Sequence, residues 1–289
     1  MSDTAFQKQY RQEFIAGFEF GQSMLRSTVV TESVVKGNEA TFLVADTGGA
    51  EAVTRGVNGM IPARADNLTQ KPAILTEWHD KPRRTRFNIF GSQGDGRRIM
   101  QQGTIKVMNR KIDDVILANL NTATQTINVT GSAADSRMVA VTKAIAVLGN
   151  NDVDVEEESN MFGVMSPAFR AFLYQNNQFT SADYVDVKPF NGPVRKMLRW
   201  AGVNWVVHSR VPGVGTANEH LFVYHRNSIG HAVNSGDMDV KAGYNEEDDY
   251  YWARTSMFMG GSLLQPNGVV VLNHDGSSMV AGAVGGGPD

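Results

Sequence analysis

Residues 161–275 constrain the fold most, because one clear helix start is followed there by a succession of strand patterns. Met161–Met165 is an apolar run, which is typical of a strand buried on both faces. Ser166 and Pro167 come next; serine can cap the free N–H groups of a helix, and proline fits its first turn. Further strands are predicted over Trp205–Ser209, Leu221–His225, Tyr250–Leu264 and Gly268–Asn273, with a hairpin turn at Gln265–Gly268. The sequence therefore predicts an α+β fold.

Two helices are predicted upstream of this strand-rich region. A long helix is expected over Thr104–Asn121, where apolar residues recur every three or four positions, and Gly103 marks its start or a kink. A second helix is expected over Ser136–Leu148. It stops at Gly149–Asn150, because glycine and asparagine readily adopt the left-handed conformation that ends a helix. An acidic connector, Asp152–Ser159, then leads into the strands.

The segment before the first helix has a different character. Residues 46–80 are rich in Gly, Pro, Thr and Asn and show no clear periodicity. About 35 such residues are too many for a plain loop inside a compact domain, so the segment is either an extended hairpin or disordered. Ala40–Ala45 is predicted to be the strand that enters it, and Thr85–Phe90 the strand that returns from it.

Aromatic residues recur every four positions at the N-terminus. Phe6, Tyr10, Phe14 and Phe18 would lie on one face of a helix, with Ser2 or Asp3 as its cap. Two interpretations are open: the helix packs on the core of its own subunit, or it is an arm that lies on a neighbouring subunit.

Composition excludes several functional classes. The chain has 289 residues, of which 42% are hydrophobic and 20% charged, and this balance allows a sizeable core. The absence of cysteine excludes disulfides, thiolate metal sites and thiol catalysis. The net charge of −3 gives no global basic excess that would indicate nucleic-acid binding. There is neither an apolar signal core nor a run near ~20 apolar residues, so a protein made in a cytoplasm without a membrane segment is expected.

No motif indicates a catalytic, cofactor or metal site. The histidines form no zinc-protease pair, and no serine lies in a nucleophile elbow. Gly91–Arg98 is rich in glycine but lacks the P-loop ending, so a strand-to-helix turn is favoured. Asp152, Asp154 and Glu156 alternate as in a calcium loop, but Glu157 stands where that loop needs glycine. A solvated acidic loop is favoured, and we predict no enzyme activity and no cofactor.

The order of these elements resembles the C-terminal half of the major capsid proteins of tailed bacteriophages, the Hong Kong 97 fold. The resemblance is carried by MFGVMSPAFRAFL (Met161–Leu173), GVNWVVHSRVP (Gly202–Pro212), HLFVYHRNSIGHAV (His220–Val233) and YYWARTSMFMGGSLLQPNGVVVLNHD (Tyr250–Asp275). It implies an N-terminal arm, an extended loop that reaches across an adjacent subunit, a peripheral domain with a long spine helix, and an axial domain. The expected parts are residues 1–36 (arm helix), 37–95 (strand and extended loop), 96–160 (peripheral domain with spine helix), 161–275 (axial domain and returning peripheral strands) and 276–289 (flexible Gly-rich tail).

The resemblance also implies a function. Many copies would assemble as hexamers and pentamers into an icosahedral shell around double-stranded phage DNA, in the cytoplasm of a bacterial host and then in the virion. No long coiled-coil segment precedes the arm, so a separate scaffolding protein is expected as a partner, together with a portal and a possible decoration protein. Two alternatives stay open: the shell protein of an encapsulin-like nanocompartment, and, in a different class, a β-rich hydrolase or binding module.

Charge segregation suggests where subunits meet. Residues 71–111 contain ten basic and three acidic residues, a local net charge of +7, whereas residues 237–249 contain six acidic residues and one lysine, a net charge of −5. Solvated faces, non-specific contact with DNA phosphates, or head-to-tail pairing of subunits would each explain this pattern. Under the last interpretation, the candidate intersubunit contacts are the four N-terminal aromatic residues together with Arg83, Arg84, Arg86, Glu156, Glu157, Glu158, Glu246, Glu247, Asp248 and Asp249.

Overall fold

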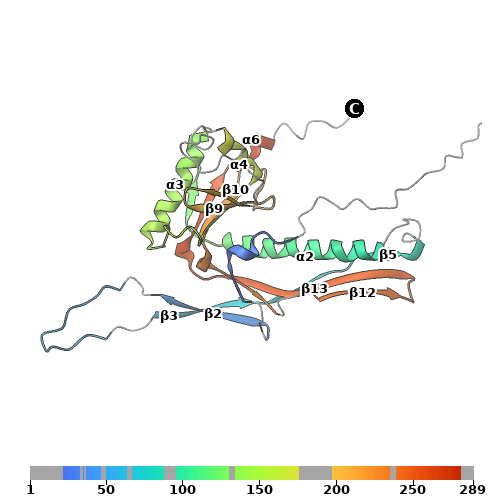
Figure 1. The fold of residues 1–289 in the computed structure, drawn as a ribbon, viewed down its shortest axis with the longest axis horizontal. Helices are drawn as coiled ribbons and strands as arrows, with labels where there is room; N and C mark the ends of the chain where they lie inside the picture. Colours follow the sequence, from blue (N-terminus) through green and yellow to red (C-terminus); the bar gives the residue numbers. More distant parts are fainter. Residues whose placement is uncertain are drawn as a thin grey trace, which may run out of the picture.

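The molecule has three parts: an elongated platform, a lobe that stands on it, and a hairpin that projects from one end (Figure 1). This computed structural model describes residues 22–32, 35, 37–46, 50–63, 67–87, 96–129, 134–175, 197–234 and 239–280. The four aromatic residues of the predicted N-terminal arm helix and most of the Gly-rich tail lie outside the described residues. Within the predicted arm, residues 1–36, the described residues form a 3-10 helix, η1 (Arg26–Thr28), and a strand, β1 (Val30–Glu32). Helices and strands both contribute throughout, as the α+β prediction requires.

The platform is a six-stranded sheet built around one long strand. Its strands are β1 (Val30–Glu32), β4 (Thr76–Asp80), β5 (Arg83–Thr85), β11 (Ile229–Val233), β12 (Asp239–Asn245) and β13 (Tyr250–Leu263). β13 pairs antiparallel with β4, β5, β11 and β12, and β1 adds in parallel to the far edge of β11. Along β13, Ala253, Thr255, Met257 and Met259 are buried and alternate with more exposed residues. This period of two means that one face of the sheet is covered.

Helix α2 (Gly96–Leu120) covers that face, running along β13 (Figure 1). Met108, Ile112 and Ile116 form its buried stripe, and Thr255 Oγ1 donates a hydrogen bond to Thr104 Oγ1 at 2.8 Å. The long helix is therefore confirmed, but it begins at Gly96 rather than Thr104. Of the two predictions for Gly103, a start or a kink, the start is wrong, because the helix already runs from Gly96 and packs on β13.

The lobe contains a second six-stranded sheet, in the order β6-β14-β10-β7-β9-β8. Its strands are β6 (Thr126–Asn128), β7 (Met161–Met165), β8 (Met197–Trp200), β9 (Val203–Val207), β10 (Glu219–His225) and β14 (Val269–His274). Helix α3 (Ala134–Asn150) packs against β14, β6 and β10 and contacts α4 (Pro167–Tyr174), which in turn contacts α6 (Ser277–Val280). Within residues 96–160, α2 thus packs on the platform, whereas β6 and α3 pack in the lobe. The division into a peripheral and an axial domain stays a prediction.

The lobe sheet is closely packed on both faces. Every residue of β7 is buried, as its apolar run predicts. Gly163 in β7 lies under the ring of Trp205, and a Cβ at this glycine would be 2.4 Å from that ring. Trp205 is fully buried and its indole N–H donates to Trp200 O at 3.1 Å. A large aromatic side chain and a glycine on adjacent strands thus fill the centre of the lobe together.

Local signals were predicted with mixed success. The helix start at Ser166 is confirmed, because its hydroxyl accepts a hydrogen bond from Phe169 N–H at 3.1 Å. Helix α3 ends at Asn150, as predicted, but the left-handed residue is Asp152 (φ 58°) and not Gly149 or Asn150, and Val153 N–H donates to Leu148 O at 3.1 Å. The extra turn satisfies the last carbonyl groups of the helix.

Two predicted connections are wrong. The strand that returns from the extended segment is β3 (Asn67–Ile74), which pairs with β2 (Glu39–Asp46) over its whole length; within Thr85–Phe90, only Thr85 lies in a described strand. Gln265–Gly268 is not a hairpin turn, because β13 and β14 belong to different sheets. Instead, the 3-10 helix η3 (Pro266–Gly268) carries the chain from the platform into the lobe.

One buried polar cluster ties the ends of several lobe elements together. Glu219 has no exposed surface and accepts hydrogen bonds from Ser166 Oγ at 2.7 Å, His274 Nδ1 at 2.9 Å and Gly215 N–H at 2.8 Å. Arg137 Nε donates to His274 Nε2 at 3.3 Å, so the proton of that neutral ring is on Nδ1 and points at Glu219. All three donors satisfy the carboxylate in the interior, where it would otherwise be costly.

Candidate assembly surfaces

The β2–β3 hairpin exposes apolar side chains that the subunit itself does not cover. Seven large hydrophobic residues are more than half exposed between residues 39 and 74: Leu43, Val53, Val57, Met60, Ile61, Leu68 and Ile74. Val57, at the far end, is as exposed as in an open chain, and every described residue from 50 to 63 is exposed. Of the two predictions for residues 46–80, the extended hairpin is the one that the described residues form.

The end of the hairpin is nevertheless shaped by backbone contacts. Gly56 N–H donates to Met60 O at 3.1 Å, and Gly59 N–H donates to Gly56 O at 2.8 Å. Gly59 has φ 71°, which favours glycine, and Arg55 Nη1 donates to Gly59 O at 3.2 Å. This turn presents Val57 and Met60 to solvent at the part of the hairpin most distant from the lobe (Figure 1).

The root of the hairpin is packed against the platform. Phe42 lies on Gly230 of β11, where a Cβ would be 2.8 Å from its ring. Gly260 of β13 lies under the backbone of Ile74, and a Cβ there would be 2.1 Å from Ile74 O. Ala40, Ala73 and Ala232 belong to a small buried cluster around this crossing. The hairpin is thus fixed at its base and unsupported along its outer part.

The three candidate arginines lie on or next to β5, at the end of the platform. β5 pairs with the first residues of β13, Arg84 opposite Tyr251 and Arg83 opposite Trp252. The Arg83 guanidinium lies 5.0 Å from the centre of the Tyr250 ring, a cation–π contact that orients it. Arg86 follows β5 and is exposed.

The acidic turn Glu246–Asp249 lies at the same end of the same subunit, because it joins β12 to β13 next to β5. Asn245 Oδ1 accepts hydrogen bonds from the N–H groups of Glu247 (2.9 Å) and Asp248 (3.3 Å), which fixes the turn. Tyr244 donates a hydrogen bond to Asp249, which raises the pKa of Tyr244, and the charge of Arg86 acts in the opposite direction. The sequence did not indicate that these basic and acidic candidates are neighbours within one chain.

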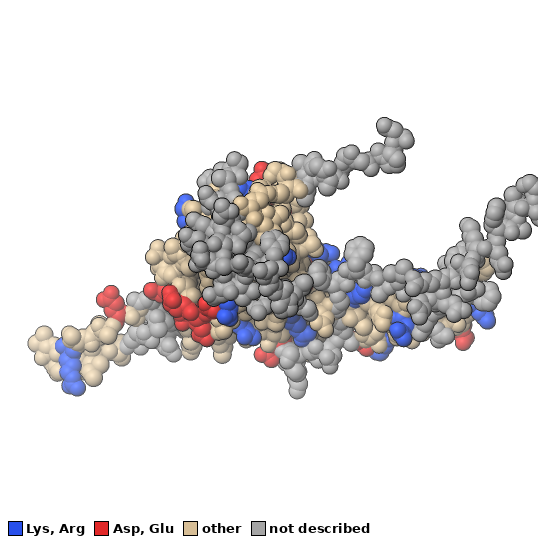
Figure 2. Space-filling view, turned by 45° about the horizontal axis from the view of Figure 1, so that its top comes forward, with Lys and Arg blue, Asp and Glu red and all other residues tan. Residues whose placement is uncertain are grey.

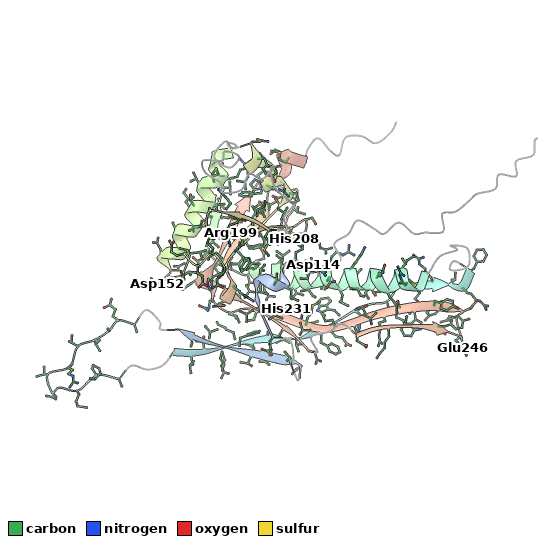
Figure 3. The ribbon with its side chains drawn as sticks, viewed as in Figure 1. Asp114, Asp152, Arg199, His208, His231 and Glu246 are labelled. Atoms are coloured by element: carbon green, nitrogen blue, oxygen red, sulfur yellow. The ribbon has the colours of Figure 1, made fainter. Side chains whose placement is uncertain are left out.

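The second acidic candidate group, Glu156–Glu158, lies elsewhere. Figure 3 places Asp152, just before it, beneath the lobe and far along the long axis from Glu246. Asp154 Oδ1 accepts hydrogen bonds from Glu156 N–H (3.2 Å) and Glu157 N–H (3.3 Å). Glu158 pairs with Arg199 of its own subunit at 3.0 Å. Figure 2 shows basic side chains spread along the platform and a compact acidic group below the lobe, on the side of the hairpin.

Sequence reasoning missed a polar site at the junction of lobe and platform. Asp113 is an acidic residue beside the buried stripe of α2, is only 3% exposed and lies 3.3 Å from His208 of the lobe. The adjacent Asp114 pairs with Arg210 through two hydrogen bonds of 2.8 and 2.7 Å. The signal was present in the sequence: Ile112 and Ile116 mark the buried face, and an acid next to that stripe needs a partner.

The N-terminal aromatic candidates and the searches for metal sites and membrane helices remain. Phe6, Tyr10, Phe14 and Phe18 are not among the described residues, so the arm stays a prediction. In the described part of the chain, no three His, Asp or Glu side chains come together in a group that could hold a metal ion. Within the same residues, no helix is both long and apolar enough to cross a membrane.

Comparison with known proteins identifies the architecture. The chain is similar in structure to a protein of Mycobacterium phage Che8 (17% identity, TM-score 0.74, covering 94% of this chain and 98% of that one). It is also similar to the capsid of cyanophage P-SCSP1u (13% identity, TM-score 0.71, 93% of each chain) and to that of a native GTA particle (13%, TM-score 0.70, 94% of this chain and 96% of that one). These likenesses confirm the Hong Kong 97 fold. A search of curated protein sequences finds no match.

The family follows from a match at the level of sequence. The profile of a family described as phage capsid protein matches residues 2–276, nearly the whole chain. Neither the nanocompartment shell nor the β-rich hydrolase or binding module is supported by any of these matches. An exposed apolar hairpin, a platform with a long helix, and a separate lobe are accordingly parts of a structural shell subunit and not of an enzyme: the chain belongs to the phage capsid protein family and is a major capsid protein.

Proposed function

We propose that subunits associate head to tail in hexamers and pentamers, with the outer part of the β2–β3 hairpin lying on an adjacent subunit. The observation that carries this proposal is the exposure of seven large apolar residues on one hairpin. Burying apolar surface stabilises a contact by about 25 cal/mol per Å², and a single subunit leaves this surface in water. We propose that an adjacent subunit covers this surface, because every copy in a shell exposes the same apolar residues.

The charged candidates take a narrower role in this proposal. Arg83, Arg84 and Arg86 share one end of the platform with Glu246–Asp249, whereas Glu156–Glu158 lie far along the long axis (Figure 3). Head-to-tail association brings opposite ends of two subunits together, so Glu156 and Glu157 are the partners we propose for the arginines. Glu158 already pairs with Arg199 of its own chain. Pairing of the arginines with the turn Glu246–Asp249 of another subunit would require the same ends of two platforms to meet.

The other partners follow from the shell itself. We propose that the particle encloses double-stranded DNA, contacted non-specifically through basic side chains. A separate scaffolding protein would assist assembly in the host cytoplasm, with a portal at one vertex and a possible decoration protein outside. The N-terminal aromatic residues Phe14 and Phe18 would anchor the arm on a neighbour; replacing both with alanine should then block assembly without lowering the melting temperature of the subunit.

Assembly variants test the hairpin. Replacing Val57, Met60 and Ile61 with serine should leave the subunit folded but prevent the formation of particles in negative-stain images and in light scattering. A control replacement of two exposed polar residues outside the hairpin, Gln102 and Thr142, should assemble normally. Normal particles from the hairpin variant would contradict the proposal.

Charge reversal tests the ionic contact. Arg83, Arg84 and Arg86 changed to glutamate should reduce assembly, and Glu156 and Glu157 changed to lysine should partly restore it. Each exposed pair contributes only about 0–1 kcal/mol, but a closed shell repeats it in every subunit. Restoration by lysine at Glu246 and Glu247 instead would show that platform ends meet one another, and would overturn the assignment to Glu156 and Glu157.

A further inference from the structure

A short N-terminal segment lies between the lobe and the platform. It comprises Gln22–Glu32, including the 3-10 helix η1 (Arg26–Thr28) and strand β1. Three of its groups donate hydrogen bonds to Asp113 of α2: Ser23 Oγ at 2.5 Å, Leu25 N–H at 3.1 Å and Met24 N–H at 3.1 Å. One buried carboxylate thus accepts three hydrogen bonds from the segment, beside the burial of Leu25 and Val29 and the pairing of β1 with β11.

The same carboxylate is bound from the lobe. His208 follows β9, is 5% exposed, and its Nε2 lies 3.3 Å from Asp113 Oδ2. Arg210 N–H donates to His208 Nδ1 at 3.2 Å, so Nδ1 is an acceptor and Nε2 carries the proton that points at Asp113. His208 N–H in turn donates to Met165 O at 2.9 Å, which connects this contact to β7 in the centre of the lobe sheet.

A second contact joins the segment to the lobe directly. Thr28 Oγ1 donates to Leu25 O at 2.7 Å, so the 2.6 Å hydrogen bond between Thr28 and Tyr224 is donated by the tyrosine hydroxyl. Both side chains have no exposed surface, and Tyr224 belongs to β10 of the lobe. The segment thus contacts the helix below and the sheet above through buried hydrogen bonds. Figure 3 shows His208 and His231 close to this junction.

The N-terminal segment and the lobe bind the same carboxylate, so each contact depends on the other. A buried carboxylate is tolerated only while its oxygens accept hydrogen bonds, and Asp113 has three donors from the segment and one from the lobe. Loss of donors from one side leaves a poorly satisfied charge, which then favours rearrangement of the other side. Coupling of this kind is reciprocal by thermodynamic necessity.

We propose that Asp113 couples the docking of the Gln22–Glu32 segment to the position of the lobe on the platform. Displacing the segment loosens the lobe, and moving the lobe releases the segment. Through Asp113, the segment therefore influences the angle between lobe and platform. In this role Asp113 is a positioning residue, and Ser23 and His208 act through it from opposite sides.

Amide hydrogen exchange on the full-length, unassembled subunit tests the coupling. H208Q acts from the lobe, and we expect it to accelerate exchange at the Met24 and Leu25 amides by about tenfold, as expected for weakening hydrogen bonds to a charged group. S23A acts from the segment, and we expect it to accelerate exchange at the His208 amide, which donates to Met165 O. The double variant should show less than the product of the two effects, because each single change already removes the coupling.

Two further variants keep the test decisive. D114N removes the charge of Asp114 and one of its two hydrogen bonds with Arg210, and should leave exchange at Met24 and Leu25 within about twofold of the wild type. T28V removes the hydrogen bonds of the Thr28 hydroxyl with Tyr224 and with Leu25 O but leaves all four donors to Asp113 in place, so it provides a second variant of the segment if S23A or H208Q fails to fold. It should also accelerate exchange at the His208 amide. If H208Q and T28V each affect exchange only on their own side of the junction, the contacts are local and the proposal is overturned.

Discussion

The lobe sheet and the β2–β3 hairpin are both rich in apolar residues, yet they use them in opposite ways. Strands β7, β10 and β14 bury nearly every residue within their own subunit, whereas the hairpin leaves Leu43, Leu68 and Ile74 more than half exposed. Apolar content alone therefore does not tell whether a strand finds its cover in the same chain. The distinction comes from layers: helix α3 packs on the lobe sheet, whereas the outer part of the hairpin is exposed, with no second layer among the described residues.

The largest expected effect lies in the lobe. Trp205→Ala removes a fully buried indole that lies on Gly163, and we expect the free energy of unfolding to fall by about 3–5 kcal/mol. Chemical denaturation of the unassembled subunit measures this loss. A loss below about 1 kcal/mol would mean that the lobe tolerates a cavity at its centre and that the contrast with the hairpin is weaker than burial indicates.

Sequence reasoning was most successful where one segment carries its own signal. The run Met161–Met165, the cap at Ser166 and the long helix were all predictable, because periodicity and capping are local properties. It failed where pairing decides the outcome. Nothing in Gln265–Gly268 reveals that the flanking strands belong to different sheets, and Thr85–Phe90 resembles a returning strand although β3 fulfils that role.

The next effect concerns the junction and depends on pH. His231 of β11 has no exposed surface, and neither ring nitrogen has a hydrogen-bond partner among the described residues. Burial, assisted by the charge of Arg26, lowers the pKa of His231 from 6.5 to about 4, and the charge of Asp113 opposes this only in part. The unfolded chain therefore binds a proton between pH 6.5 and about 4 that the folded subunit excludes.

This difference in proton binding means that the subunit becomes less stable as the pH falls. Stability is complete above the unfolded pKa of 6.5 and falls as pH drops toward about 4, by roughly 3 kcal/mol in total. Denaturation curves from pH 7 to pH 4.5 should show this slope, and His231→Phe should remove most of it. A slope that persists unchanged in the phenylalanine variant would assign the acid sensitivity to another group.

A smaller effect is expected from the buried cluster in the lobe. Glu219→Gln keeps the shape but places an amide opposite the donors Ser166 Oγ and His274 Nδ1, and we expect a loss of about 1.5–3 kcal/mol at pH 7. Burial alone would raise the pKa of Glu219, but the hydrogen bonds from His274, Gly215 and Ser166 hold it below the usual 4.5. The stabilisation is thus present above pH 4.5 and is lost as pH falls below it.

Comparing the stability of the wild type and Glu219→Gln as a function of pH isolates the contribution of the Glu219 carboxyl. Below pH 4.5 the two stability curves should converge, because the wild-type carboxyl becomes protonated there as well. Parallel curves down to pH 3 would show that Glu219 is not the group whose protonation matters. The control is Glu158→Gln, which breaks a largely exposed pair with Arg199 and should change stability by no more than about 1 kcal/mol.

The candidate site was less predictable than the fold, for a physical reason. Charge counts located Arg83–Arg86 and Glu246–Asp249 correctly as charged segments, but the pairing of β5 with β13 brings them to one end of one subunit. Asp113 escaped notice because its donors come from residue 23 on one side and residue 208 on the other. Contacts between residues so distant in sequence leave only an indirect trace, here an acid beside an apolar helix stripe.

The smallest effect on stability is expected in the hairpin, where it carries the most information about assembly. Leu43→Ala should change the free energy of unfolding of the isolated subunit by less than about 0.5 kcal/mol, because Leu43 is 71% exposed there. The same substitution in the lobe, Leu221→Ala, removes a fully buried side chain and should cost about 2–5 kcal/mol. In particles the order should change: Leu43→Ala should lower the temperature at which shells dissociate, because a neighbour then covers the leucine. If shells of this variant are as stable as those of the wild type, the hairpin is exposed in the assembly too, and the contrast between the two regions has another cause.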